Sequence, residues 1–255
     1  MYLRCPKCHH HPMPLEQALP AACPACGVVL AKVAQVRADT PTRRRSAPMD
    51  GRPSRLANLA SLLLHVPERV DVARFWFRAV VLVAFGIWGL RLIALDLRSG
   101  EMGSSFLHGP LLVFHEAGHV LLSPFGQWIM VLGGTLAQLL LPALICAAFL
   151  LKNRDPFGAA IGLWLFGVSV LDVAPYMYDA LEPTLMLLSG QTGEAGGHDW
   201  IYLFESMGLR PRAQGIGRLT HTIGALIVLL ALAWAGWLLK LQRARLTSRS
   251  RSFPS

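Results

Sequence analysis

Five apolar stretches, each close to the length needed to cross a lipid bilayer, constrain the fold of this chain more than any other feature. They cover residues 75–95, 106–123, 128–151, 157–180 and 218–239. A helix needs about 20 apolar residues to cross roughly 30 Å of hydrocarbon, so the second stretch is short. We therefore predict an all-α polytopic membrane protein with about five transmembrane helices, in a membrane domain at residues 74–241.

The distribution of charge favours a membrane protein over a water-soluble enzyme. Only 15% of the 255 residues are charged, whereas an ordinary soluble domain has about 25%. The formal net charge is +9, but the charges gather toward the ends of the chain, and Glu116 is the one Asp, Glu, Lys or Arg residue between positions 106 and 151. A nucleic-acid-binding protein needs its cations on one face of a solvated body. We therefore expect a lipid bilayer and no nucleic acid as partner.

Residues 1–30 contain two Cys-x-x-Cys pairs separated by fourteen residues. These are Cys5 with Cys8 and Cys23 with Cys26. Four thiolates at this spacing are typical of a tetrahedral structural zinc site, and so short a segment would depend on the metal for its fold. The segment resembles a zinc ribbon, in which His9, His10 or His11 could also replace a thiolate. The alternative is a pair of disulfide bonds, which would require an oxidising compartment.

The segments that flank the membrane domain are basic. Residues 31–73 are rich in Arg, Pro, Ala and Ser and include the run Arg43–Arg45, which predicts a basic flexible linker. Residues 242–255 form a second basic segment, predicted to be a tail. We expect a bacterial-type cytoplasmic membrane with the zinc ribbon in the cytosol.

Five crossings leave one conflict with this distribution of charge. Positive charge before Phe75 keeps the N-terminal end inside, so the first helix would run outward and the helix at 106–123 inward. His119 would then lie toward the cytosolic end. Five crossings would place the basic residues after Lys240 outside, against the tendency of positive charge to stay inside. The alternative is four crossings with one re-entrant segment.

The second apolar stretch contains an H-E-x-x-H motif, formed by His115, Glu116 and His119. The i, i+4 spacing places both imidazoles on one face of a helix, where they can hold a metal ion, and the glutamate can take a proton from water at the metal. Ionisable side chains at membrane depth are costly and usually functional. A catalytic zinc site needs a third protein ligand and an open position.

Four polar residues farther along the chain are candidates for that third ligand. Asp172 and Asp179 are seven residues apart and share one helical face, with Pro175 between them, which would disrupt the helix. His198 and Asp199 lie in the loop at 182–216, where they could serve as ligands or orient a substrate.

Three motifs in this order resemble those of the site-2 protease family of intramembrane zinc metalloproteases. They are His115–His119, Gly134–Gln138 and Asp172–Ala180. The resemblance covers about residues 106–181 and implies a three-helix metalloprotease core that crosses the membrane fully. It further implies His115, His119 and Asp179 as zinc ligands and Glu116 as the general base.

The motifs differ from the family pattern at three positions. Gln138 stands where the family usually has Asn, and its amide could bind a substrate carbonyl. Asp172 also stands where Asn is usual. Asp179 comes one residue early and is followed by Ala180 instead of Gly, so Asp172 or a residue of the following loop is the alternative ligand.

The resemblance implies hydrolysis of peptide bonds in membrane-embedded protein substrates, with one catalytic and one structural zinc ion. A transmembrane substrate helix must unwind to expose its carbonyl groups. The ribbon is expected to recruit or sense a cytosolic partner. The alternative is a non-proteolytic, membrane-tethered zinc-ribbon interaction protein with a degenerate protease core.

Overall fold

The computed structural model describes residues 5, 7–10, 22–29, 55–67 and 70–251. The chain forms two compact units, Met1–Ser54 and Arg55–Ser255. The larger unit contains the membrane domain and begins before the predicted boundary at residue 74. Most of the predicted basic linker, residues 31–54, and residues 11–21 of the predicted ribbon lie outside the described residues.

The described part of the smaller unit consists of two turns of the same geometry, one around each Cys-x-x-Cys pair. In the first turn, the N–H of Cys5 donates to the His10 carbonyl and the N–H of His9 donates to the Cys5 carbonyl, both at 3.0 Å. Cys23 makes the two equivalent bonds at 2.9 and 2.8 Å. His9 and Gly27 hold the same place in the two turns, and both have a positive φ, of 60° and 68°. The two turns bring their cysteines together.

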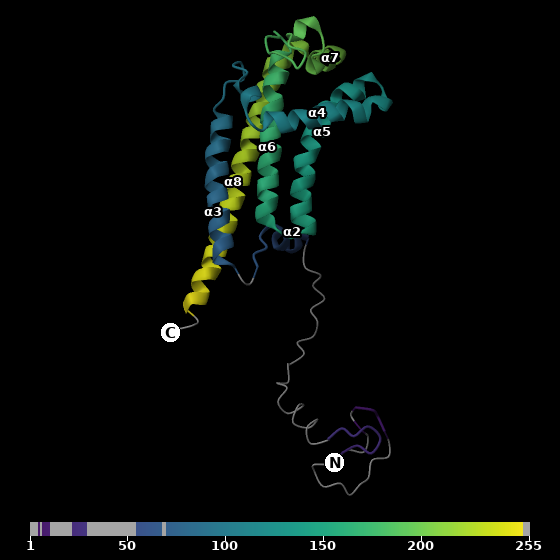
Figure 1. The fold of residues 1–255 in the computed structure, drawn as a ribbon, viewed down its shortest axis with the longest axis vertical. Helices are drawn as coiled ribbons and strands as arrows, with labels where there is room; N and C mark the ends of the chain where they lie inside the picture. The colour runs from purple at the N-terminus through teal and green to yellow at the C-terminus, as the bar shows by residue number, and fades with distance from the viewer. Residues whose placement is uncertain (1–4, 6, 11–21, 30–54, 68–69, 252–255) are drawn as a thin grey trace. The chain divides into compact units, whose positions relative to one another are not determined.

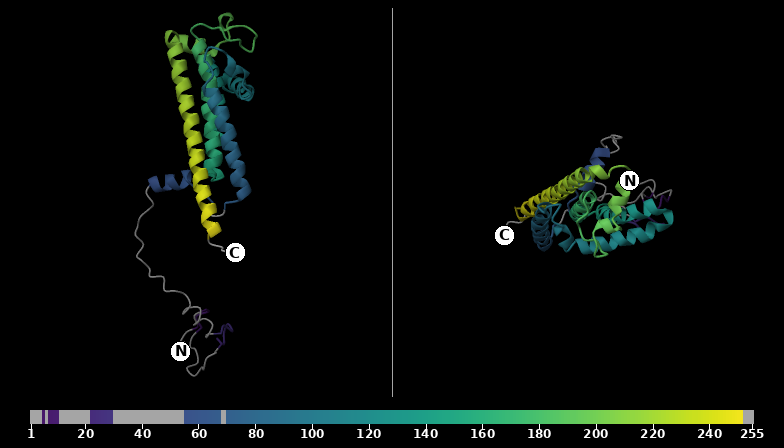
Figure 2. Two further views of the ribbon diagram at one scale, coloured as in Figure 1. Left: turned by 90° about the vertical axis from the view of Figure 1, so that its left-hand side faces the viewer. Right: turned by 90° about the horizontal axis from the view of Figure 1, so that it is seen from above.

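Four helices of the larger unit are long and apolar enough to cross a membrane, by length and composition. They are α3 (Val72–Ile93), α5 (Gln127–Ala147) with the π-helical turn η3 (Ala148–Lys152), α6 (Pro156–Asp179) and α8 (Ala213–Arg251). They run along one common direction in Figures 1 and 2. The described residues are therefore those of an all-α membrane protein, with one span fewer than the five predicted.

α6 is the central helix of this bundle. About 72% of its most apolar window is buried, against 17–28% for the other three spans. Small residues let its neighbours approach, as is common between membrane helices. A Cβ on Gly167 would lie 2.9 Å from the backbone nitrogen of Val228 on α8, and one on Gly89 of α3 would lie 2.7 Å from the Trp164 indole nitrogen. Pro175 does not end α6, which continues to Asp179.

The helix that carries the H-E-x-x-H motif, α4 (His108–Leu122), has 15 residues and is not among the candidate spans. It lies across the direction of the long helices and forms a hairpin with the first part of α5 through η2 (Ser123–Phe125), as Figure 1 shows. The two helices approach closely because glycines face each other: a Cβ on Gly118 would lie 2.1 Å from the Gly133 carbonyl oxygen. The prediction of a crossing at 106–123 is thus corrected, because this helix is too short to cross.

α5 contributes to both the hairpin and the bundle because it changes direction along its length (Figure 1). Pro142 lies inside α5 and has no N–H, so the Gln138 carbonyl loses its helical donor. The Ser169 hydroxyl on α6 donates to that carbonyl at 3.1 Å. A proline bend in a membrane helix is tolerated when a neighbouring side chain binds the freed carbonyl in this way.

Two flanking segments differ from their sequence predictions. The end of the predicted linker forms a helix, α2 (Arg55–Leu63), whose last carbonyl accepts a hydrogen bond from the Trp234 indole of α8 at 3.0 Å. Arg245 of α8 donates to the Pro67 carbonyl at 2.9 Å. Residues 242–251, predicted to be a separate tail, continue α8 without a break. α2, the start of α3 and the end of α8 therefore lie at one end of the larger unit.

The chain between α6 and α8 folds at the opposite end of the bundle. It contains η4 (Gly193–Ala195), α7 (Asp199–Ser206) and η5 (Arg210–Arg212). A short antiparallel bridge joins Met186 to Thr192. α7 buries Leu203 and Phe204 against the bundle. The connector between α3 and α4, with η1 (Glu101–Ser104), lies at this end as well.

Candidate metal centre

Both histidines of the H-E-x-x-H motif turn toward one carboxylate. The rings of His115 and His119 lie one turn apart on α4, with centroids separated by 4.9 Å. Oδ2 of Asp199 is 2.9 Å from Nε2 of His115 and 3.3 Å from Nε2 of His119. Ligand atoms around a tetrahedral zinc ion, with bonds of about 2.0 Å, would be separated by about 3.3 Å. The three atoms are therefore spaced like ligands of one ion.

The other ring nitrogens fix the tautomers of the two histidines. Nδ1 of His119 is 2.9 Å from the Met130 carbonyl oxygen, which can only accept, so this nitrogen carries the proton. Nδ1 of His115 is 3.0 Å from Oε1 of Gln138. The Gln138 amide group donates to Oδ2 of Asp172 at 2.8 Å, which leaves its oxygen facing His115. In the neutral form of each ring, Nε2 therefore carries a lone pair.

The chemistry of these donors fits a divalent metal ion. In these neutral forms, the two lone pairs and the carboxylate oxygen repel one another unless a proton on Nε2 or a metal ion lies between them. Two imidazole nitrogens and one carboxylate oxygen form a set that zinc uses in hydrolases, with a position left open for water. A carboxylate oxygen of Glu116 lies within 4.8 Å of both histidine ligand atoms. It is thus placed to exchange protons at the open position.

A glycine makes room for the two imidazoles. A Cβ on Gly134 of α5 would lie 2.5 Å from Nε2 of His115 and 2.6 Å from Nε2 of His119. Because real Cβ atoms do not approach other atoms so closely, any larger residue would displace the histidines. The Gly134–Gln138 stretch that the sequence analysis singled out therefore contributes space at one end and an orienting amide at the other.

Asp199 is held in place by the first turn of α7. Its N–H donates to the Tyr176 hydroxyl of α6 at 3.0 Å. The preceding residue, His198, is the N-cap of α7, and its Nδ1 accepts a hydrogen bond from the N–H of Ile201 at 3.3 Å. The rings of Tyr176 and His198 stack with centroids 4.1 Å apart. His198 is only 4% exposed, and its contacts are those of a residue that positions Asp199, not of a metal ligand.

Asp179, the third ligand implied by the family resemblance, makes its contacts away from the two histidines of the motif. Its Oδ1 accepts hydrogen bonds from the N–H groups of Thr184 and Leu185 at 2.8 and 3.1 Å. Its Oδ2 lies 3.4 Å from Nε2 of His198. Asp179 therefore anchors the loop that carries Asp199, and Asp199, named in the sequence analysis as an alternative, is the carboxylate that lies beside the two histidines.

Gln138 and Asp172 also have roles other than those predicted. Both ends of the Gln138 amide are bonded within the protein and the residue is only 3% exposed, so it orients His115 and is not free to bind a substrate carbonyl. Asp172 orients Gln138 with one oxygen, and its other oxygen lies 2.9 Å from Nδ1 of His108. Hydrogen bonds thus connect four side chains in series, namely His115, Gln138, Asp172 and His108.

A cavity of about 1110 Å³ opens beside the three ligands. It lies between α4, α5 and α6 and extends to the connectors at 99–103 and 184–197. Apolar side chains line much of it, among them Leu112, Val131 and Val173. Binding pockets for small molecules have volumes of roughly 300–1000 Å³, so this space is large enough for several residues of an extended chain.

The four cysteines of the smaller unit form a second candidate metal site. Their sulfur atoms all lie within 4.8 Å of one another, and all four thiols are free of disulfides. Sγ of Cys5 is 3.8 Å from Sγ of Cys26, and Sγ of Cys8 is 3.7 Å from Sγ of Cys23. The backbone N–H of Cys8 lowers the pKa of the Cys5 thiol to about 6. For Cys8, the backbone N–H of His10 acts to lower the pKa, but hydrogen bonds with the other thiols and burial outweigh it and raise the pKa to about 12.

Sequence reasoning missed three contributors to the membrane site. His108, Tyr176 and the Met130 carbonyl all orient a ligand or a residue bonded to one. Spacing could have indicated two of them. His108 lies seven residues before His115 and so shares its helical face, and Tyr176, four residues after Asp172, shares the face of Asp172 in the same way. A backbone carbonyl such as that of Met130 leaves no signal in side-chain identity. Comparisons of the chain with protein-family models, curated proteins and solved structures give no match.

Proposed function

We propose that this chain is an integral-membrane zinc metalloprotease with His115, His119 and Asp199 as metal ligands and Glu116 as general base. The observation that carries the proposal is the convergence of both Nε2 atoms on Oδ2 of Asp199 while both Nδ1 atoms are bonded elsewhere. The motif resemblance to the site-2 protease family supports the same reaction. The ligand set differs from that resemblance in its third member.

The chain's own residues account for positioning and proton transfer in this reaction. A bound zinc ion supplies the Lewis acidity that lowers the pKa of water and polarises the scissile carbonyl. The Glu116 carboxylate takes a proton from the attacking water as the new C–O bond forms. It then delivers the proton to the amide nitrogen as the C–N bond breaks. Gln138 and the Met130 carbonyl keep the two imidazoles aimed during these steps.

The substrate of this reaction is a protein segment in extended form. The cavity beside the ligands combines apolar walls with the polar metal site, which suits the backbone of an apolar segment whose helix has unwound. A transmembrane protein with a glycine- or proline-weakened helix has this chemistry. The large apolar areas exposed on α3, α5 and α8 are those expected of a body in lipid.

The smaller unit holds a structural zinc ion in this proposal. A tetrahedral site with Zn–S bonds of about 2.3 Å has sulfur atoms about 3.8 Å apart. The Cys5–Cys26 and Cys8–Cys23 sulfur distances, 3.8 and 3.7 Å, are close to this value. Disulfide sulfurs would be only about 2.05 Å apart. The unit is then a zinc ribbon in a reducing compartment, available to a cytosolic partner.

Zinc stoichiometry of the purified full-length protein in detergent tests both sites. The wild type should contain two zinc ions. His119→Ala and Asp199→Ala should each lose one, and the pair Cys5→Ser/Cys8→Ser should lose the other. If Asp199→Ala keeps both ions while Asp179→Ala loses one, the assignment of the third ligand is wrong.

A cleavage assay distinguishes an active protease from a protein whose site no longer has activity. Glu116→Gln should keep both zinc ions but should not cleave a membrane-anchored peptide that the wild type cleaves. A single zinc, lost only when the cysteines are replaced, would instead favour the alternative of a non-proteolytic zinc-ribbon interaction protein tethered to the membrane.

A further inference from the structure

The charged side chains at the two ends of the bundle differ in sign. At the end formed by α2, the start of α3, the α5–α6 turn and the end of α8, cations predominate. They are Arg74, Arg78, Lys152, Arg154, Lys240, Arg243 and Arg245. The described acidic residues at this end are Asp71 and Asp155. This end, with its large excess of positive charge, is called the basic end below.

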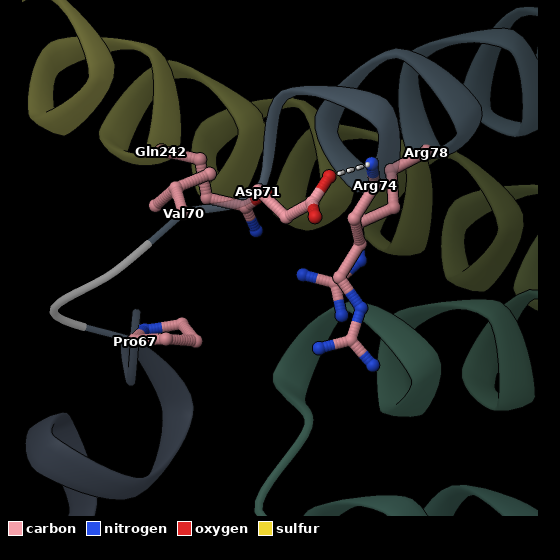
Figure 3. A pocket seen from close by; sticks show the side chains of 6 residues that line it. All are labelled: Pro67, Val70, Asp71, Arg74, Arg78 and Gln242. Atoms are coloured by element: carbon pink, nitrogen blue, oxygen red, sulfur yellow. Dashed lines mark hydrogen bonds between the residues drawn. The ribbon is translucent and has the colours of Figure 1, made fainter.

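Two cations of the basic end, Arg74 and Arg78, lie in the first turns of α3. Figure 3 shows Arg74 and Arg78 extending from α3 over a small pocket, next to Asp71 and to Gln242 of α8. Asp71 caps the helix by accepting from the N–H of Arg74 at 3.0 Å. Arg78 is paired with Asp155 at 2.8 Å, which ties α3 to the start of α6.

The opposite end carries an excess of acidic residues. The basic residues there are Arg91, Arg98, Arg210, Arg212 and Arg218. The acidic residues are Asp96, Glu101, Asp179, Glu182, Glu194, Asp199 and Glu205. Short loops and helix ends rich in Lys and Arg stay on the cytosolic side of a membrane. With four spans, the starts of α3 and α6 and the ends of α5 and α8 all share the basic end, so seven described Lys and Arg residues lie at that end against five at the other.

The candidate metal centre lies near the acidic end. Asp172, which is linked to His115 through Gln138, is seven residues before the end of α6, a distance of about 10 Å along the helix. The cavity beside the ligands reaches the connectors of this end, at residues 99–103 and 184–197. The starting residue of α6, beside the basic end, is about 24 Å from Asp172 along the axis.

We infer that the metal centre opens to the outer face of the membrane, on the side opposite the zinc ribbon. No apolar stretch of spanning length lies between the ribbon and Val72, so the ribbon shares the side of the basic end. The substrate is then a protein segment that emerges at the outer leaflet, and the protein joins an outer protease site to an inner metal-binding head. The substrate class rests on the proposed function, whereas the orientation does not. This reverses the expectation that His119 lies toward the cytosol.

Cysteine labelling with a membrane-impermeant maleimide tests the orientation. Two variants each add one exposed cysteine to the full-length chain: Glu194→Cys in the outer connector and Ala244→Cys near the end of α8. The parent protein, with its five native cysteines, is the matched control. In intact spheroplasts, we expect label above the parent for Glu194→Cys and none for Ala244→Cys. After permeabilisation, Ala244→Cys should gain label.

Every other pattern overturns the inference. Label on Ala244→Cys but not on Glu194→Cys in intact spheroplasts would place the metal centre on the cytosolic side. Label on both, or on neither until permeabilisation, would place the two ends on one side and contradict the four spans. Because labelling needs neither zinc nor proteolysis, failure of the proposed function would leave this result unchanged, and a reversed orientation would leave the protease proposal standing.

Discussion

At the scale of single residues, the site depends on what each ligand is bonded to beyond the metal position. His115 and His119 both have an acceptor at Nδ1, and Asp199 is fixed by the hydroxyl of Tyr176. Such contacts set the tautomer and the direction of a ligand, and their loss typically lowers metal affinity by about 10- to 100-fold. The orienting residues are therefore as informative to mutate as the ligands.

Gly134→Ala should remove zinc from the membrane site without unfolding the protein. The new methyl group would lie 2.5 and 2.6 Å from the two Nε2 atoms, so the imidazoles would have to move apart. We expect zinc affinity at this site to fall by about 10-fold or more, and we expect the ribbon to keep its zinc ion. Metal analysis after dialysis against a zinc buffer measures this. Gly109→Ala, on α4 where a Cβ meets no atom within 4 Å, is the matched control and should keep both ions.

Gln138→Leu should weaken the same site by a different route. Leucine leaves Nδ1 of His115 without an acceptor and Oδ2 of Asp172 without a donor, so the imidazole loses its fixed tautomer. Zinc affinity should fall by about 10- to 100-fold. The control is Gln127→Leu, an exposed position at the start of the same helix. Equal zinc titrations for the two variants would show that Gln138 does not orient the ligand.

At the scale of elements, one carboxylate joins two helices of the bundle. Asp155 caps α6 by accepting from the N–H groups of Phe157 and Gly158 at 3.1 and 3.2 Å. It also pairs with Arg78 of α3, whose guanidinium lies 5.1 Å from the centre of the Phe157 ring. Since the Arg78 side chain is only 9% exposed, this ion pair fixes α3 against α6 near the basic end.

Asp155→Ala should lower the thermal stability of the protein in detergent. Loss of the cap costs about 1 kcal/mol, and leaving a mostly buried guanidinium without its partner costs about 1–3 kcal/mol more. The apparent Tm should therefore fall by roughly 5–10 °C. Asp96→Ala removes a carboxylate from an exposed pair with Arg98 at 3.9 Å and should change the Tm little. Similar Tm values for both variants would contradict a structural role for Asp155.

At the scale of the whole molecule, an even number of spans is the premise of the orientation that we infer. The start of α3 and the connectors around Asp199 lie at opposite ends of the bundle (Figure 1). In the inferred orientation, each candidate metal site meets the solution on its own side of the membrane. A change in zinc or in a binding partner on one side can reach the other site only through the helices.

A membrane-impermeant chelator should distinguish the two sites by their side. In right-side-out vesicles, EDTA outside should remove one of the two zinc ions, the one that Asp199→Ala also lacks. In inverted vesicles, EDTA should remove the ion that Cys5→Ser/Cys8→Ser lacks. Zinc content per protein after washing measures both. Removal of the ribbon zinc from right-side-out vesicles would contradict the arrangement.

Patterns that repeat over short distances were readable in the sequence itself. Four of the five apolar stretches form helices of spanning length. The length of an apolar stretch can be read from the sequence and compared directly with the thickness of the bilayer. The two cysteine pairs and the H-E-x-x-H motif are also local, since their spacing alone sets which atoms can meet. These features predicted the helical membrane fold and the pairs of cysteines and histidines that the structure brings together.

The tertiary structure decided how these local features combine. The helix within residues 106–123 is too short to cross the membrane, and its hairpin with α5 depends on the Gly118–Gly133 contact, which does not follow from hydropathy. The choice between Asp179 and Asp199 depends on a loop whose fold brings together residues 84 positions apart in the chain. Such long-range contacts leave no periodic signal, because they arise from packing between elements. The sequence therefore determined which side chains could act, and packing determined which of them meet.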